Sequence, residues 1–245
     1  MRNIKLTIEY EGTSYAGWQI QRKTKRTIQE TIEKTLRKIL QEKIKIIGSG
    51  RTDAGVHALG QVANFKTNSK IPLEKLQKAA NALLPKDIVV NKIEEASSDF
   101  HARFQAKSKL YRYTILNRKY PCVFLRSWVY FYLYPLDVDL MRRQAKCLIG
   151  RHNFKSFQAS AKLDRSSIRT IKQIKIKNKS GLITIDIEAD GFLYNMVRNI
   201  AGTLIEIGRA RFPRGSMREI LAFKDRTKAG PTAPACGLCL IKVNY

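Results

Sequence analysis

Hydrophobic and polar positions along the chain follow two periods, which predict strands and helices in a repeated order. Ile4, Leu6 and Ile8 alternate with polar residues, as in a strand with one buried face. Further strands are expected at 43–48, 60–66 and 86–96. A helix is expected to open at Thr27, where TIQE fits a capping box and an apolar stripe of helical spacing follows. A second helix is expected over 72–84, so the first part of the chain reads βαββαβ.

The second part of the chain repeats this order of elements. The expected strands are 110–116, a hairpin over 171–189 and 236–243, and the expected helices are 137–149, 193–208 and 216–223. Two copies of a split βαβ unit predict an α+β fold of two ferredoxin-like halves, whose antiparallel sheets join around a central cleft. The seam is expected near residues 105–109, which divides the chain into 1–106 and 107–245.

Charge adds a class of partner to this picture. The chain of 245 residues has 46 Lys and Arg against 20 Asp and Glu, a net charge of +26. An excess of this size favours a polyanionic partner, above all nucleic acid, over a basic surface that serves only solubility. The lysine-rich run 172–179 is expected to be a solvated basic edge that can also contact phosphates.

Membrane and export signals are not expected in this sequence. No apolar run approaches the roughly 18 residues of a membrane span, and no basic helix has a bulky aromatic face. The N-terminal alternation lacks the apolar core of a signal peptide, so we expect the protein to stay in the cytoplasm.

Cysteine and histidine spacing does not predict a metal site. Cys236 and Cys239 form a single CxxC without a second ligand pair, and Cys122 and Cys147 are isolated. The histidines lack the spacing of a metal site or a catalytic triad; they are His57, His101 and His152.

One carboxylate stands in an unusual setting, the segment GSGRTDAGVH at 48–57. This glycine-rich segment lies between two expected strands and is neither a P-loop nor GxGxxG, so no nucleotide cofactor is expected. From the pattern alone, Asp53 is a turn residue whose carboxylate bonds its own backbone, because Asp beside Gly is common turn chemistry. His57, four residues further on, could orient the loop.

Four longer motifs extend that segment into a family resemblance. They are GSGRTDAGVHALGQVANF (48–65), FHARFQAKSKLYRY (100–113), FLYNMVRNIAGTL (192–204) and AGPTAPACGLCL (229–240). In this order and over nearly the whole chain, they resemble the tRNA pseudouridine synthase A family. The resemblance implies isomerisation of uridine to pseudouridine at positions 38, 39 and 40 of the tRNA anticodon stem-loop. It also implies a homodimer and no cofactor or metal.

The resemblance assigns roles to individual residues. It makes Asp53 the catalytic carboxylate and Arg51 the residue that holds the flipped-out base conformation. Tyr111 is expected to stack on the uracil, with Tyr113 as its competitor on the same strand face. Arg198 is expected to pair with Asp53, and such a partner lowers the pKa of a carboxylate by about 1 to 3.

The alternative is a non-catalytic, basic tRNA-binding protein of duplicated ferredoxin-like domains. A binding protein needs the basic surface but has no use for Asp53, Tyr111 and Arg198 together. Their joint occurrence in the family motifs therefore favours the enzyme.

Overall fold

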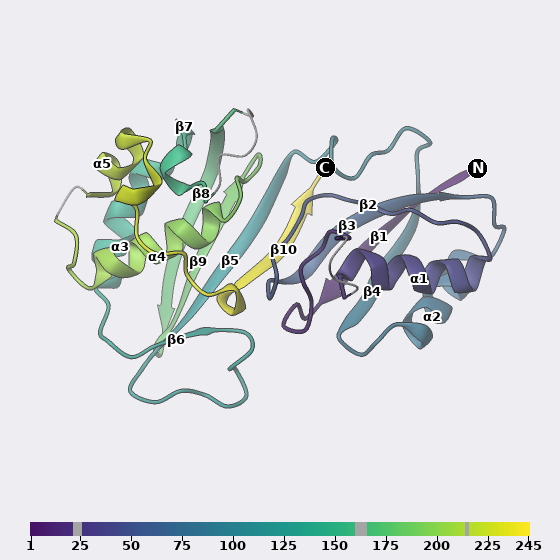
Figure 1. Cartoon of the computed structure of the whole chain (residues 1–245), viewed down its shortest axis with the longest axis horizontal. Coiled ribbons are helices and arrows are strands. Elements are labelled where there is room, and N and C mark those ends of the chain that lie inside the picture. Colours follow the sequence, from purple (N-terminus) through teal and green to yellow (C-terminus); the bar gives the residue numbers. More distant parts are fainter. Residues whose placement is uncertain (22–25, 160–165, 214–215) are drawn as a thin grey trace. The chain divides into compact units, whose positions relative to one another are not determined.

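The chain folds into two compact units with mixed α and β structure. A computed structural model describes residues 1–21, 26–159, 166–213 and 216–245. The first unit is Met1–Lys107 with Leu240–Tyr245, and the second is Ser108–Cys239. The α+β class predicted from the sequence is confirmed, and Figure 1 traces the elements along the chain.

The C-terminal residues correct the division expected at 1–106 and 107–245. Residues 240–245 belong to the first unit, because strand β10 (Leu238–Asn244) lies beside strand β3 (His57–Thr67) in the sheet. Two hydrogen bonds secure this end of the chain. The Lys107 N–H donates to the Asn244 carbonyl (2.8 Å), and the Tyr245 hydroxyl donates to the Ala102 carbonyl (2.7 Å).

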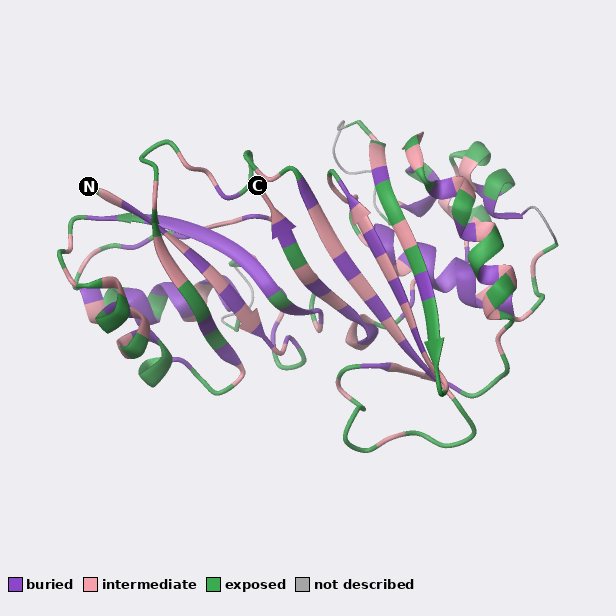
Figure 2. Cartoon of the chain, turned by 180° about the vertical axis from the view of Figure 1, so that it is seen from behind, coloured by how far each residue is buried: buried purple, intermediate pink, exposed green. Residues whose placement is uncertain are grey.

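The sheet of the first unit runs in the order β4 (Ile88–Ala96), β1 (Arg2–Tyr10), β3 and β10, with β2 (Ile47–Gly48) beside β3. β1 is antiparallel to both of its neighbours. Its predicted apolar positions, Ile4, Leu6 and Ile8, are at most 1% exposed, so the alternation is confirmed. Helices α1 (Ile28–Leu40) and α2 (Leu73–Leu83) cover this buried face (Figures 1 and 2).

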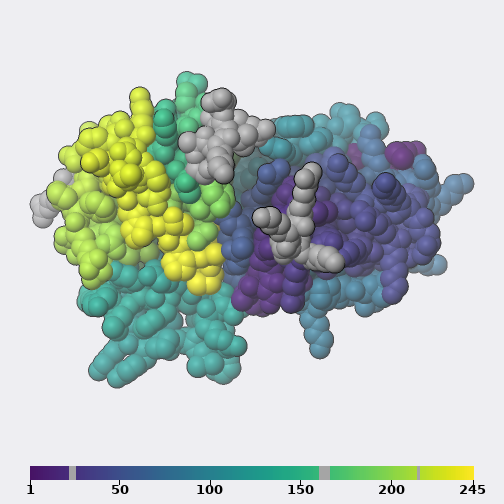
Figure 3. Space-filling view, in the orientation of Figure 1, coloured from purple at the N-terminus to yellow at the C-terminus, as the bar shows by residue number. Residues whose placement is uncertain are grey.

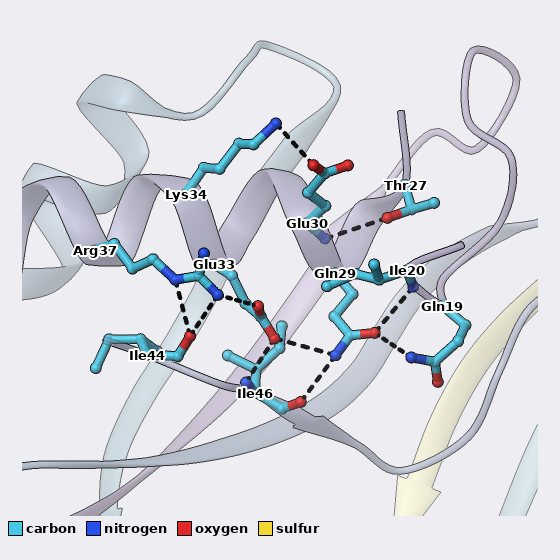
Figure 4. A network of polar contacts seen from close by, with 10 residues as sticks. All are labelled: Gln19, Ile20, Thr27, Gln29, Glu30, Glu33, Lys34, Arg37, Ile44 and Ile46. Carbon is cyan, nitrogen blue, oxygen red and sulfur yellow. Dashed lines mark hydrogen bonds and ion pairs between the residues drawn. The ribbon is translucent and has the colours of Figure 1, made fainter. Parts of the chain in front are cut away.

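Helix α1 begins where the sequence predicts. The Thr27 hydroxyl accepts the Glu30 N–H at 3.3 Å, which satisfies one free donor of the first turn. The Glu30 carboxylate pairs with Lys34 at 2.8 Å, so only the threonine half of the capping box forms (Figure 4). The apolar stripe is buried, as expected, at Ile28, Ile32, Leu36 and Leu40.

The strand expected at 43–48 is much shorter, because side chains of α1 take the backbone groups that a strand would use. The Glu33 carboxylate accepts the Ile46 N–H at 3.0 Å. The Arg37 guanidinium donates to the Ile44 carbonyl at 3.0 and 3.1 Å (Figure 4). Only the two residues of β2 remain to pair with β3.

The second unit has a sheet in the order β5 (Ser108–Asn117), β9 (Leu182–Ala189), β8 (Ile168–Lys179) and β7 (Gly150–Asn153), and β6 (Tyr130–Tyr132) pairs in parallel with β5. The predicted hairpin is confirmed as β8 and β9, with positive φ at Ser180 and Gly181 in its turn. β6 and β7 were not predicted, because three or four residues show no reliable period.

Helices α3 (Val138–Ala145), α4 (Met196–Gly208) and α5 (Ser216–Phe223) lie on one face of this second sheet (Figures 1 and 2). Shorter 3-10 turns are Lys146–Leu148, Lys155–Phe157, Arg226–Lys228 and Ala235–Gly237. Cys236 therefore lies in a turn before β10 and not in the strand expected at 236–243. Among the described residues, no helix is long and apolar enough to cross a membrane.

Apolar and aromatic side chains are exposed on the segment between β5 and β6, which is teal in the space-filling view of Figure 3. Phe124 is 91% exposed and Val123 70%. Exposed apolar groups in such number commonly mark a contact surface.

Candidate active site

Asp53 lies in the loop between β2 and β3, and the backbone there forms a tight turn. The Asp53 carbonyl accepts the Val56 N–H at 3.2 Å, and Gly55 has a φ of +77°. A positive φ at the third residue of a turn favours glycine, which explains the DAG sequence. Asp53 is half-buried and Arg51 is exposed, with buried Thr52 between them.

The start of this loop is held by strand β3. Ser49 is fully buried, its N–H donates to the Val62 carbonyl at 2.7 Å, and its hydroxyl donates to Gln61 Oε1 at 2.7 Å. Gln61 Nε2 donates to the Gly50 carbonyl at 3.1 Å. One buried amide side chain thus fixes two successive loop residues.

The middle of the loop rests on the segment that follows β1. The Tyr10 and Thr52 hydroxyls share a buried hydrogen bond of 2.8 Å, and the Trp18 N–H donates to the Thr52 carbonyl at 3.0 Å. Gly17 has a φ of +91°, and a Cβ there would lie 2.5 Å from the Thr52 carbonyl oxygen. Glycine at this position lets two backbone segments touch directly beside Asp53.

The end of the loop is held by the same segment. The Gly55 N–H donates to the Tyr15 carbonyl at 3.3 Å, and the Gly12 N–H donates to His57 Nδ1 at 3.1 Å. His57 is 1% exposed, which fits the expectation that it orients the loop. The Tyr15 hydroxyl donates to Asp87 Oδ1 at 2.6 Å, and burial together with this carboxylate raises the pKa of the tyrosine.

Sequence reasoning did not identify the supporting segment 11–18. A signal was present, because EGTSYAGW places two glycines and two large aromatic residues within eight positions. Glycines spaced among aromatic residues mark places where backbone packs closely against other groups.

The two candidate tyrosines lie on one face of β5. Tyr113 is fully buried, and its hydroxyl donates to the Pro234 carbonyl at 2.9 Å, which makes it a core residue. Burial raises the pKa of Tyr113. Tyr111 is 7% exposed, and its ring meets that of Phe192 edge to face at 5.1 Å.

Arg198 lies in the first turn of α4 and is anchored by two side-chain hydrogen bonds. Its Nε donates to the Ala233 carbonyl at 2.7 Å, and its Nη1 donates to Asn195 Oδ1 at 3.2 Å. Asn195 is the residue before the helix and has a φ of +58°. Arg198 and Tyr113 therefore bind the consecutive carbonyls of Ala233 and Pro234.

Two of the four sequence motifs pack directly on each other. A Cβ at Gly202 of α4 would overlap the Pro231 carbonyl, and the Gly230 N–H donates to the Thr203 hydroxyl at 2.9 Å. Glycine is thus needed at 202 and at 230 for the close backbone contact between the two motifs. This contact supports the Ala233 carbonyl, which Arg198 binds.

The four predicted site residues divide between the two units. Asp53 and Arg51 belong to the first, and Tyr111 and Arg198 belong to the second. The pairing of Asp53 with Arg198 stays a prediction. In the described parts of the chain, no group of three or more His, Cys, Asp or Glu side chains has the arrangement of a metal site.

Comparison with known proteins identifies relatives along the whole chain. The family described as tRNA pseudouridine synthase matches residues 6–105 and 145–245. Proteins named tRNA pseudouridine synthase A from a Thermoanaerobacter species and from Acetivibrio thermocellus are 49% and 46% identical, and "tRNA pseudouridine synthase A 2" from Clostridium perfringens is 49% identical. Each of the three alignments covers 100% of both chains.

A solved structure titled "Crystal Structure of a Cbf5-Nop10-Gar1 Complex" is a more distant likeness. Its TM-score is 0.40 at 17% identity, over 97% of this chain and 49% of the other. The sequence comparisons are decisive without it: this chain belongs to the tRNA pseudouridine synthase family.

Proposed function

We propose that this protein is a tRNA pseudouridine synthase that isomerises uridine to pseudouridine at positions 38, 39 and 40 of the anticodon stem-loop. The observation that carries the proposal is the full-length similarity to proteins named tRNA pseudouridine synthase A. The net charge of +26 supports a polyanionic substrate of this kind. The similarity favours an enzyme over a tRNA-binding protein without activity.

The reaction needs a carboxylate near the ribose of the target nucleotide. The bond from N1 of uracil to C1′ breaks, the detached ring turns within the site, and C5 then bonds to C1′ as its proton leaves. Asp53 serves this chemistry by attack on C1′, by attack on C6, or by removing the C2′ proton in a glycal route. The hydrogen bonds around residues 49–57 support the role, because a preorganised loop keeps the carboxylate from reorienting during the reaction.

The target base must leave its stack before it can react, which costs a few kcal/mol. Arg51 is exposed beside Asp53 and is suited to hold the flipped conformation through a phosphate or the vacated base position. Tyr111 stacks on the displaced uracil, while Tyr113 has its hydroxyl bound within the core. Arg198 holds Asp53 ionised and directs it at the sugar.

The proposal includes a homodimer that acts in the cytoplasm without metal or cofactor. The dimer and the absence of a metal or cofactor are what the family resemblance implies, and together with the location they are part of the proposal. Sedimentation at the concentrations of the activity assay tests the dimer, and treatment with a chelator tests the absence of a metal requirement.

The decisive experiment uses an unmodified tRNA transcript and maps pseudouridine by carbodiimide-dependent stops in primer extension. The parent protein is expected to give stops one nucleotide to the 3′ side of positions 38, 39 and 40 where these are uridine. Asp53→Asn is expected to bind the tRNA like the parent and to form no pseudouridine, because the amide lacks the nucleophilic oxygen. Asp99→Asn, an exposed change in the same unit, is the matched control and keeps activity. Full turnover by Asp53→Asn would refute the assignment of the carboxylate.

A further inference from the structure

The second unit has a cavity whose lining includes none of the four predicted site residues. It has a volume of about 280 Å³ and opens between α3 and β8. Apolar side chains form its floor, among them Ile149, Ile174 and Ile176. Ile149 is 44% exposed, so the floor is accessible from solvent.

Cations surround this apolar floor. They are Arg142 and Lys146 on the helix side and Lys175 and Lys177 of β8, which alternate with the two strand isoleucines and reach the open edge from the opposite face of the strand. Arg142 is held in place, because its Nε donates to the Ile176 carbonyl at 2.9 Å and its Nη1 pairs with Asp139. We call this cavity and its cations the β8 groove.

The three lysines of the β8 groove are not neutralised by the protein. All three are exposed, and within the described parts of the chain none forms an ion pair. Asp186 of β9, which pairs with Lys175 in the strand register, is instead bound by Arg112 through two contacts of 2.7 and 2.8 Å. Ammonium groups gathered without counter-charge repel one another, and an anionic ligand relieves that repulsion.

The β8 groove is open because the sheet ends there. β7 pairs only with the first residues of β8, Ile168–Ile171 in the register, so no strand among the described residues pairs with the outer edge of the lysine-rich half. Figure 2 shows β8 banded with exposed residues along its length. Sequence analysis predicted a basic edge at 172–179, and the structure adds an apolar cavity beside it.

The strand register relates the β8 groove to Tyr111. Ile187 of β9 pairs with Tyr111 of β5 on one side and with Ile174 of β8 on the other. Directly paired residues point to the same face, and neighbouring strands are about 4.8 Å apart. Tyr111 and Ile174 therefore lie in one row, about 10 Å apart along the sheet.

We propose that the β8 groove binds the sugar-phosphate backbone of the tRNA substrate at nucleotides other than the one that reacts. Pockets that enclose a whole small molecule have volumes of about 300 Å³ and above. The β8 groove, at about 280 Å³, is slightly smaller and suits a single nucleotide of a longer chain. Lysines at the rim pair with phosphates, and the isoleucine floor contacts a ribose or base. The proposal rests on the function proposed above for its choice of RNA.

Three exposed lysines beside an apolar floor favour RNA over other anions. Phosphates of a chain are spaced so that several ammonium groups are satisfied at once, and such contacts need no fixed base sequence. A membrane surface is less suitable, because the apolar residues lie within a recess between a helix and a strand and do not project.

The test measures how tRNA affinity depends on salt. All proteins carry Asp53→Asn, so that the RNA stays unmodified during the binding measurement. The groove variant adds Lys146→Gln, Lys175→Gln and Lys177→Gln, and filter binding is followed at several salt concentrations. The slope of log K for tRNA binding against log salt is negative. If the three lysines neutralise two or three phosphates, their removal makes this slope shallower by about 1.5 to 2.5.

A matched control removes the same charge elsewhere. Lys38, Lys75 and Lys86 are exposed in the first unit, and their replacement by Gln is expected to leave the slope near that of the parent. Ile149→Trp fills the β8 groove without changing charge, and it is expected to weaken binding while circular dichroism stays like that of the parent.

Three results would overturn the proposal. They are a salt slope in the groove variant equal to that of the parent, an equal change of slope in the control variant, and parent-like tRNA affinity of Ile149→Trp. Binding to phosphatidylglycerol vesicles is measured for the same proteins. If the groove variant loses vesicle binding but keeps its tRNA affinity, the β8 groove is a membrane contact and the proposal is refuted. Pseudouridine formation by the protein with Asp53 intact is measured separately. Failure of that assay would refute the proposed function, whereas the salt slopes would still decide the role of the β8 groove.

Discussion

Replacement of Gly17 by alanine tests whether the backbone contact beside Asp53 sets the rate of the reaction. The new methyl group would lie 2.5 Å from the Thr52 carbonyl oxygen and 3.0 Å from the Asp53 carbonyl carbon. Atoms of this kind do not approach closer than about 3 Å, so the Thr52–Asp53 peptide must move by about 0.5 Å or more. The Asp53 carboxylate must move with it.

Gly17→Ala is expected to lower both the folding stability and the reaction rate. The φ of +91° costs a residue with a Cβ about 1 to 3 kcal/mol of folding free energy. Catalytic groups tolerate misplacement of only about 0.5 Å, and a 1 Å error can cost about a hundredfold in rate. We therefore expect a folded variant whose single-turnover rate on saturating tRNA is about ten to a hundred times lower.

Gly150→Ala is the control for Gly17→Ala. Gly150 has a similar φ of +106°, but the nearest atom to its added Cβ is His152 Nε2 at 3.4 Å, an ordinary contact. This variant is expected to lose similar stability in urea denaturation and to keep the parent rate. The reasoning fails if Gly17→Ala is folded and fully active, or if Gly150→Ala loses as much rate.

Substitutions at three further residues test other contacts. Glu33→Ala is expected to lose about 1 to 3 kcal/mol in urea denaturation, because the buried N–H of Ile46 loses its acceptor, whereas Glu33→Gln keeps an acceptor and loses less. His57→Leu is expected to lower the single-turnover rate and His57→Asn to restore most of it, because the Asn side-chain oxygen can accept the Gly12 N–H; equal rates would exclude a positioning role. Arg198→Met is expected to move the acid limb of the pH–rate profile upward, because a carboxylate without its cation protonates at higher pH. Arg198→Lys is expected to restore the limb but not the maximal rate, and identical profiles for all three proteins would exclude the proposed pair with Asp53.

Elements defined by neighbouring residues were predictable from the sequence. The alternation of Ile4, Leu6 and Ile8 and the cap at Thr27 are local features, and both appear in the structure. The strand expected at 43–48 failed because its backbone partners come from side chains of a helix about ten residues earlier. Hydrophobic periodicity contains no information about such polar contacts.

The candidate site shows the same limit. Asp53 is identifiable by its motif, but nothing near it in the sequence indicates that Tyr10 and Trp18 hold its loop. Tyr111 and Tyr113 are indistinguishable by strand period, and only the bond from Tyr113 to the Pro234 carbonyl separates them. Such assignments depend on long-range contacts, which a single sequence does not display.

The membership of residues 240–245 in the first unit has a consequence for synthesis of the chain. The ribosome completes residues 1–107 early, yet the strand that lies beside β3 is made only after the whole of the second unit. Until then the edge of β3 is without its partner strand, and an uncovered edge is a template for pairing with other chains. Loss of residues 240–245 would thus damage the unit that is encoded first.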